Sequence, residues 1–101
     1  TVAKIGGLAM PDNGFGWMDP ANRPDVATFI AAQERWYRHT IDAFGPDRCM
    51  FESNFPVDFL SVDYAVYWEA CRQMAASYTD AEQADLFAGT AARVYSLELP
   101  A

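Results

Sequence analysis

The chain has 101 residues, of which 51% are hydrophobic, and a formal net charge of −7 at pH 7. The length allows one small domain with its own core, and the hydrophobic content argues against a disordered tail. The negative charge argues against a nucleic-acid-binding surface, and no apolar run in the sequence approaches the length of a membrane span. We therefore expect a soluble cytoplasmic protein that binds neither nucleic acid nor membranes.

The first predicted element is a strand over residues 2–8, which the Gly6-Gly7 pair ends or kinks. Residues 9–24 are rich in Gly, Pro, Asn and Asp and predict a long loop, and loops of this length are often functional. A helix should follow, with Pro24 and Asp25 in its first turn and Gly45-Pro46 after its end. Its expected apolar stripe comprises Val26, Phe29, Ile30, Trp36, Tyr37, Ile41 and Phe44.

A second strand is predicted over residues 48–52, followed by a loop over residues 53–60. We expect the next helix to begin with Ser61 as its N-cap and Asp63 in its first turn. Its expected buried stripe comprises Tyr64, Tyr67, Trp68, Cys71, Met74 and Tyr78.

The C-terminal part of the chain predicts two more helices. Residues 79–82 form a capping box for the first of them, which Gly89-Thr90 should break or bend. The last helix is expected over residues 91–97, with Val94 and Leu97 as its apolar contacts. Cys49 and Cys71 fit no metal or redox spacing, and two buried free thiols are favoured over a disulfide.

The order strand, loop, helix, strand, loop, helices makes two consecutive βα units, so the strands should be parallel with a right-handed crossover. Two parallel strands with uncovered faces are not stable alone. The predicted fold class is therefore α/β, and both strands need neighbours that this sequence does not supply.

The segment over residues 48–58, Arg-Cys-Met-Phe-Glu-Ser-Asn-Phe-Pro-Val-Asp, is the most informative part of the chain. A short apolar run leads directly into Glu52, Ser53 and Asn54. Parallel α/β proteins place their chemistry at such strand ends. Ser53 lacks the glycine-flanked elbow of a serine hydrolase, so a nucleophilic role for it is weakly supported.

This segment resembles the last barrel strand of the amidohydrolase-related family, metal-dependent hydrolases of TIM-barrel fold, whose pattern is roughly Arg-hydrophobic-Met-Phe-Gly-Ser-Asp-hydrophobic-Pro. Residues 3–8, Ala-Lys-Ile-Gly-Gly-Leu, are similar to the family's seventh-strand pattern, typically Val-Lys-Leu-Ser-Gly-Leu. Residues 44–48 are similar to its Phe-Gly-Pro-Asp-Arg approach to strand eight. Residues 91–97 are similar to its closing helix, although Thr90 stands where Asn is usual.

The resemblance covers nearly the whole chain. It implies that residues 1–101 are the C-terminal βαβα part of a TIM (β/α)8 barrel, namely strand seven, helix seven, strand eight and the C-terminal helices. Such a piece is incomplete on its own, because a whole barrel needs about 250 residues. The rest of the barrel, or further copies of this chain, would complete the core.

The resemblance also implies an activity, which is hydrolysis of a lactone, amide or related small carbonyl substrate by water attack at the barrel mouth. Members of the family can hold a divalent metal, zinc or manganese, through His residues of other strands and the strand-eight Asp, which also moves the proton. In this chain Asn54 stands in place of that Asp, and the other His ligands are absent. We expect no metal and no activity for this chain alone, and we expect His39 on a helix surface.

Asn54 and Glu52 are the first candidates for catalysis. The amide oxygen of Asn54 could ligate a metal weakly or orient a water, but an amide cannot accept a proton. Alternatively, Asn54 caps the turn before Pro56. Strand alternation should point Glu52 to the same face as Asn54, roughly 6.5 to 7 Å away. Glu52 could have taken over the acidic function, but an ion pair with Lys4 is favoured.

The remaining candidates lie in the loops. Asp58 could replace the missing base if its loop folds inward, or it could be a solvated loop residue or a charge at a helix N-terminus. Phe15, Trp17 and Phe55 could wall an apolar or aromatic substrate pocket, or pack against the missing parts of the barrel.

Three readings of the function stay open. The leading one is part of a metal-assisted lactonase-like or amidase-like hydrolase. The second is a non-catalytic structural module that associates with copies of itself through open strand edges. The third is a metal-free lactonase, which the missing Asp would permit.

Overall fold

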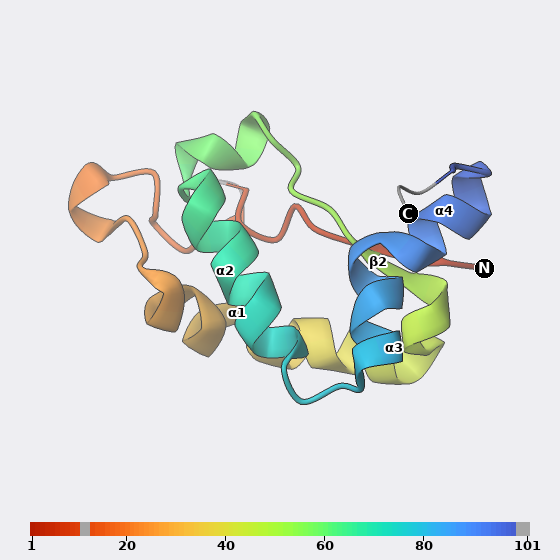
Figure 1. Cartoon of the computed structure of the whole chain (residues 1–101). Helices are drawn as coiled ribbons and strands as arrows, with labels where there is room; N and C mark the ends of the chain where they lie inside the picture. The colour runs from red at the N-terminus through yellow and green to blue at the C-terminus, as the bar shows by residue number, and fades with distance from the viewer. Residues whose placement is uncertain (11–12, 99–101) are drawn as a thin grey trace.

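The computed structural model of the protein describes residues 1–10 and 13–98 and shows a small two-stranded sheet with helices around it (Figure 1). Among these residues, no helix is both long enough and apolar enough to cross a lipid bilayer. The elements in chain order are β1 (Ala3–Ile5), the 3-10 helix η2 (Pro20–Asn22), α1 (Val26–Phe44), the 3-10 helix η3 (Pro46–Arg48), β2 (Cys49–Phe51), the 3-10 helix η4 (Val57–Leu60), α2 (Tyr64–Ala75), α3 (Asp80–Ala84), the π-helix η5 (Asp85–Gly89) and α4 (Thr90–Tyr95).

Strands β1 and β2 are parallel, which confirms the predicted arrangement, and Ala3 pairs with Cys49 in their register. Each strand has three residues and is shorter than predicted. Ile5, Cys49 and Phe51 belong to the main apolar core, whereas Lys4 is exposed. Because side chains alternate along a strand, one face of the sheet packs on the core and the other carries Lys4.

Helix α1 ends where predicted, with Gly45 at a φ of 91° donating its N–H to the Ile41 carbonyl. Its start differs slightly, because Asp25 is the N-cap and accepts a hydrogen bond from the Thr28 N–H instead of lying in the first turn. Trp36 was predicted to be buried but is 48% exposed, because it lies beside the buried stripe and stacks with Arg35 at 4.4 Å. The residues that α1 buries are Phe29, Gln33, Tyr37 and Ile41.

Helices α1 and α2 are joined to the strands through a pair of tyrosine hydroxyls. The Tyr37 hydroxyl donates to the Tyr67 hydroxyl at 3.2 Å. The Tyr67 hydroxyl in turn contacts the carbonyl oxygens of Ile5, at 3.4 Å, and of Glu52. These two carbonyls lie at the carboxyl ends of β1 and β2, so one buried side chain satisfies the ends of both strands.

Helix α2 begins at Tyr64 with Asp63 in the N-cap position, so the prediction that Ser61 caps it was wrong. Ser61 is buried and its N–H bonds to the Asp58 carbonyl, which closes η4. Tyr64 was predicted to be buried but is exposed. The residues that α2 buries are Tyr67, Ala70, Cys71, Met74 and Ala75. Cys49 and Cys71 are free and buried, as predicted.

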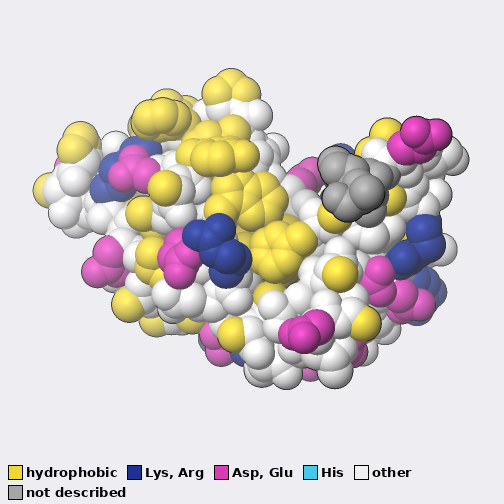
Figure 2. Space-filling view, viewed as in Figure 1, with side chains coloured by type: hydrophobic (Ala, Val, Ile, Leu, Met, Phe, Trp, Pro, Cys, Tyr) yellow, Lys and Arg dark blue, Asp and Glu magenta, His cyan; other side chains and the backbone are white. Residues whose placement is uncertain are grey.

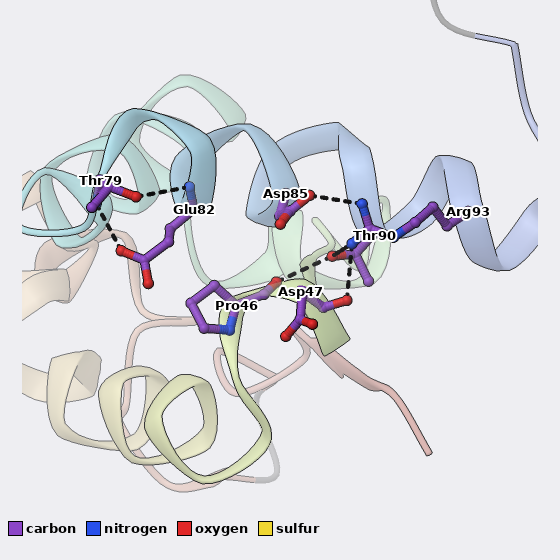
Figure 3. Close-up of polar contacts among 7 residues, drawn as sticks. All are labelled: Pro46, Asp47, Thr79, Glu82, Asp85, Thr90 and Arg93. Carbon is purple, nitrogen blue, oxygen red and sulfur yellow. Dashed lines mark hydrogen bonds and ion pairs between the residues drawn. The ribbon is translucent and has the colours of Figure 1, made fainter.

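The predicted capping box at the start of α3 is confirmed (Figure 3). The Glu82 N–H donates to the Thr79 hydroxyl at 3.2 Å, and the Thr79 N–H donates to the Glu82 carboxylate at 2.9 Å. Of the predicted break or bend at Gly89-Thr90, the break was wrong, because Gly89 has helical torsions and the helix continues through the π-helical turn η5 into α4. A Cβ atom at Gly89 would lie 2.5 Å from the side-chain Oδ1 of Asp85, so a larger residue there would displace that carboxylate from its contact with Arg93.

The C-terminal helices are held to the turn that precedes β2 (Figure 3). The Thr90 hydroxyl donates to the Pro46 carbonyl at 3.1 Å. The Arg93 guanidinium pairs with Asp85 at 2.9 Å and donates to the Asp47 carbonyl at 3.0 Å. Val94 and Leu97, predicted as the apolar contacts of the last helix, are exposed, so polar bonds to residues 46–47 hold this helix instead.

The tyrosine pair makes a testable prediction. Tyr67→Phe removes the hydroxyl that bonds to two strand-end carbonyls and leaves Tyr37 without its acceptor. We expect the free energy of unfolding, measured by urea denaturation, to fall by about 1–3 kcal/mol. Tyr64→Phe removes an exposed hydroxyl from the same helix and serves as the control; equal losses in both variants would contradict the role of Tyr67.

Candidate active site at the strand ends

The candidate site lies at the carboxyl ends of the two strands. Gly6 and Gly7 follow β1, and Glu52, Ser53 and Asn54 follow β2. The Glu52 N–H donates to the Ile5 carbonyl at 3.0 Å, which extends the strand pairing by one bond. The chain therefore leaves both strands side by side, and the segments that follow them meet at one end of the sheet.

Glu52 forms the ion pair with Lys4 that was the favoured prediction, with 3.2 Å between Nζ and Oε2. The two side chains are 52% and 32% exposed, so the pair is half-exposed, whereas a buried carboxylate had been expected. The pKa of the Lys4 ammonium is raised, because it donates a hydrogen bond to the Glu52 carboxylate. This contact balances the charge of Glu52 with that of a neighbouring ammonium group.

Gly6 is what makes room for Glu52. A Cβ atom at Gly6 would lie 2.3 Å from the Glu52 Cγ and 2.6 Å from its carbonyl oxygen, too close for any other residue. In the family patterns given above, position 6 is typically Ser and position 52 is Gly. Compared with that pattern, this chain has the smaller residue at position 6 and the larger one at position 52.

Asn54 lies at a sharp turn of the backbone, with a φ of 52° in the left-handed region that Asn adopts more readily than most residues. The regular alternation of side chains along β2 therefore stops before Asn54. The expectation that alternation points Glu52 and Asn54 to the same face rested on a longer strand and was wrong. The Asn54 side-chain Nδ2 donates to Asp58 Oδ1 at 2.8 Å. It also lies over Gly7, where a Cβ atom would be 3.5 Å away.

Asp58 is fully buried, with 0% of its surface exposed, so its loop folds inward and the alternative of a solvated residue was wrong. Its backbone carbonyl accepts hydrogen bonds from the Ser61 and Val62 N–H groups, and its own N–H donates to the Asn54 carbonyl. Its Oδ2 atom is buried and has no hydrogen-bond partner within the described residues. Burial raises the pKa of Asp58; the Asn54 hydrogen bond opposes this rise and the Glu52 charge adds to it.

Arg23 joins the loop after β1 to the loop after β2. Its Nε atom pairs with Asp63 at 2.8 Å, and its other nitrogens donate to the carbonyls of Phe59, at 2.6 Å, and Leu60, at 3.4 Å. The guanidinium also lies 5.1 Å from the centre of the Phe59 ring. Arg23 was not predicted as a site residue. Its partner Asp63 lies forty positions away, and no local sequence pattern links the two.

The three aromatic residues expected to wall a pocket do not form one wall. Phe15 stacks on Trp17 with 4.6 Å between ring centres, and Trp17 stacks on Phe29 inside the apolar core. Phe55 packs instead against Tyr64, at 5.0 Å. Phe15 and Phe55 keep partial exposure and stay candidates for contact with a substrate, whereas Trp17 has a core position.

The residues at the strand ends do not by themselves fit a divalent metal. Within the part of the chain that the structure describes, no group of three or more His, Cys, Asp or Glu side chains could hold an ion. The Lys4 ammonium beside Glu52 disfavours a second cation there, and the amide nitrogen of Asn54 is bound to Asp58. His39 is exposed on α1, as predicted. A metal at this site would need ligands from outside this chain.

Comparisons with known proteins agree on one family. A sequence model described as amidohydrolase matches residues 3–97. The uncharacterised protein y4mH of Sinorhizobium fredii is 37% identical over 94 residues, which are 93% of this chain and 27% of that protein. An L-fucono-1,5-lactonase of Burkholderia multivorans is 44% identical over 62 residues, which are 60% of this chain and 21% of that enzyme.

Two crystal structures of an amidohydrolase from Burkholderia multivorans, one with bound zinc and one with bound HEPES, resemble the fold. They give TM-scores of 0.77 and 0.78 at 34% identity, and each match covers 96% of this chain. In both cases the match covers 32% of the crystallised chain. The chain therefore spans about a quarter of the length of its curated relatives and about a third of these structures.

The buried Asp58 predicts an unusual pH dependence. Because its pKa is raised in the folded state, the proton stabilises the fold below the unfolded value, near pH 4, and this contribution is lost as the pH rises through the folded value. Asp58→Asn cannot titrate, so we expect the variant to gain stability relative to the wild type as the pH rises from 3 to 7. Urea denaturation at a series of pH values measures this difference.

Asp80→Asn changes an exposed Asp and is the control for the charge alone. If the free energies of unfolding of the wild type and Asp58→Asn run parallel over the whole pH range, Asp58 does not titrate abnormally.

Proposed function

This chain belongs to the amidohydrolase family, and on that premise we propose that it is the C-terminal part of a hydrolase acting on a lactone, amide or related carbonyl substrate. The observation that carries the proposal is the contact between Asn54 and Asp58 at the carboxyl ends of parallel strands. Enzymes with parallel α/β barrels hold their catalytic groups at this end. The L-fucono-1,5-lactonase relative favours lactones among the substrate classes.

The order of elements supports the proposed architecture. One βα unit, β1 with α1, is followed by a second, β2 with α2, and then by short helices that contact the turn before β2. This order fits strand seven, helix seven, strand eight and the C-terminal helices of a (β/α)8 barrel. We propose that residues 1–101 supply this part of the barrel and that the remaining strands complete it.

In the proposed site, Asn54 orients the attacking water or the substrate, and Asp58 transfers the proton. Since the Asn54 amide nitrogen donates to Asp58, its amide oxygen is left to accept a hydrogen bond from a water or a substrate hydroxyl. The buried Oδ2 atom of Asp58 has no hydrogen-bond partner within the described residues, and the pKa of this carboxyl is raised; both suit a group that takes a proton from a water admitted to the site and returns it to the leaving group. Glu52 would stay paired with Lys4 and shape the rim of the site.

The zinc-bound neighbour suggests a divalent metal in the full-length family. We propose that such an ion would be held by ligands outside this chain, with the Asn54 amide oxygen as one weak additional ligand. A metal-free lactonase is the second candidate, and the observation that favours it is the neutral amide at position 54. Metal analysis of the purified full-length enzyme separates the two.

Lactone hydrolysis by the full-length enzyme tests the roles of these residues. We expect Asp58→Asn to lower kcat by roughly 10²–10⁴-fold, because it removes a proton-transferring group. Glu52→Gln should lose little activity, because we place Glu52 in an ion pair and not in proton transfer. A large loss of kcat in Glu52→Gln together with an active Asp58→Asn would reverse the assignment.

A further inference from the structure

We propose that Arg23 is a positioning residue of the candidate site: it holds the segment that carries Asp58, so that the Asp58 carboxylate keeps its contact with Asn54. Arg23 belongs to the loop after β1, and Asp58 belongs to η4, the short helix after β2. The inference deepens the proposed function and rests on it, because Asp58 is the group to which that function assigns the proton transfer.

Helix η4 buries little apolar surface of its own. Val57 is 47% exposed, Phe59 is 57% exposed and Leu60 is 54% exposed. Figure 2 shows hydrophobic side chains standing out at the top of the molecule, where the loop after β2 lies in Figure 1. The one side chain that η4 buries is that of Asp58, and burying a carboxylate costs free energy. The helix therefore needs an anchor outside itself to stay in this position.

Arg23 supplies that anchor through three nitrogen atoms. Nη2 donates to the Phe59 carbonyl at 2.6 Å, Nη1 donates to the Leu60 carbonyl at 3.4 Å, and Nε pairs with Asp63 at 2.8 Å. The Arg23 side chain is only 25% exposed, and hydrogen bonds from a charged donor are roughly twice as strong as neutral ones. The residues that follow Asp58 are therefore held by a charged group from the neighbouring loop.

The Asp63 side chain contacts Arg23 at the expense of its usual role. Asp63 occupies the N-cap position of α2, where a side-chain oxygen normally accepts a hydrogen bond from the first turn. The N-cap residues of α1 and α3, Asp25 and Thr79, both make such a bond. The Asp63 side chain makes none and pairs with Arg23 instead. Helix α2 thus forgoes a capping bond in favour of the contact with Arg23.

The backbone of Arg23 is itself fixed on both sides. Before it, Asp19 caps η2 by accepting a hydrogen bond from the Ala21 N–H at 3.0 Å. After it, Asp25 caps α1 by accepting a hydrogen bond from the Thr28 N–H at 2.8 Å. A functional group stays in its productive geometry only when the residues that support it are held in this way. Arg23 therefore meets the requirement for a supporting residue.

Arg23 acts on Asp58 through the backbone of η4. Among the described residues, no hydrogen bond or ion pair joins the two side chains. Asp58 is bound to Asn54 twice, through its N–H to the Asn54 carbonyl at 3.0 Å and through Oδ1 to the Asn54 amide at 2.8 Å. A shift of residues 59–63 would draw Asp58 away from both contacts. Loss of Arg23 should therefore misplace the carboxylate without removing a group that contacts the substrate.

The kinetics of lactone hydrolysis by the full-length enzyme test this role. We expect Arg23→Ala to lower kcat by roughly 10–100-fold while KM changes by less than about twofold, because a proton-transferring group is misplaced and no substrate contact is lost. Arg23→Lys keeps the positive charge but not the planar fork of donors, so its kcat should lie between those of Arg23→Ala and the wild type.

Arg38→Ala is the matched control. Arg38 also connects two segments, because it pairs with Glu34 of α1 at 3.3 Å and donates to the Met74 carbonyl of α2 at 3.1 Å. Its guanidinium likewise lies over an aromatic ring, that of Tyr78, at 5.6 Å. These contacts lie at the carboxyl end of α2, whereas Arg23 holds its amino end. Arg38→Ala should therefore keep the kcat of the wild type, and equal losses of kcat in both alanine variants would overturn the proposal.

A double variant tests whether Arg23 acts through Asp58. If it does, adding Arg23→Ala to a protein that already carries Asp58→Asn should lower kcat by less than about twofold, because the group that Arg23 positions is gone. A further loss as large as that from Arg23→Ala alone would overturn the proposal. Arg23→Lys takes the place of Arg23→Ala in this comparison if the alanine variant does not fold.

Hydrogen exchange on the same proteins gives a readout that does not depend on hydrolysis. The N–H groups of Ser61 and Val62 bond to the Asp58 carbonyl, so their exchange rates report whether η4 keeps its position. We expect both rates to rise roughly tenfold or more in Arg23→Ala and to stay unchanged in Arg38→Ala. Unchanged rates in Arg23→Ala would overturn the proposal. Faster exchange together with full activity of Asp58→Asn would reject the proposed function but support the anchoring of η4 by Arg23.

Discussion

The Tyr67 hydroxyl is the contact on which the geometry of this chain depends. A sheet of two three-residue strands makes few hydrogen bonds, so contacts at its carboxyl ends matter for holding the strands in place. Helix α2 brings Tyr67 to the carbonyls of Ile5 and Glu52, and Tyr37 of α1 bonds to the same hydroxyl. One buried oxygen thus connects both strands and both long helices directly below the candidate site.

Two departures from the family pattern, at positions 52 and 54, are each accommodated by a specific neighbour. Glu52 fits because Gly6 leaves its space open and Lys4 supplies a cation. Asn54 retains the side-chain length of the Asp it replaces, and a carboxylate stands 2.8 Å from it at Asp58. Under the proposed function, the acid would therefore stand one hydrogen bond away from position 54. This arrangement favours a rebuilt site over a site from which the polar groups have decayed.

Features set by the order of the elements or by a local motif could be predicted from the sequence. The alternation of elements predicted parallel strands, residues 79–82 predicted the capping box, and Lys4 followed from adjacency as the partner of Glu52. The backbone geometry of two turns could not be predicted. The left-handed turn at Asn54 depends on η4 folding back under it, and the continuous helix at Gly89 depends on an unusually wide turn beside Asp85.

The placement of Arg23 has a consequence for the loops at this end of the sheet. Its guanidinium holds Asp63 and two carbonyls of η4, while its backbone belongs to the loop that follows β1. Neither segment can shift by itself without breaking a charged contact, so Arg23 couples the positions of the two loops. High salt, which weakens such a contact, should therefore loosen both loops together.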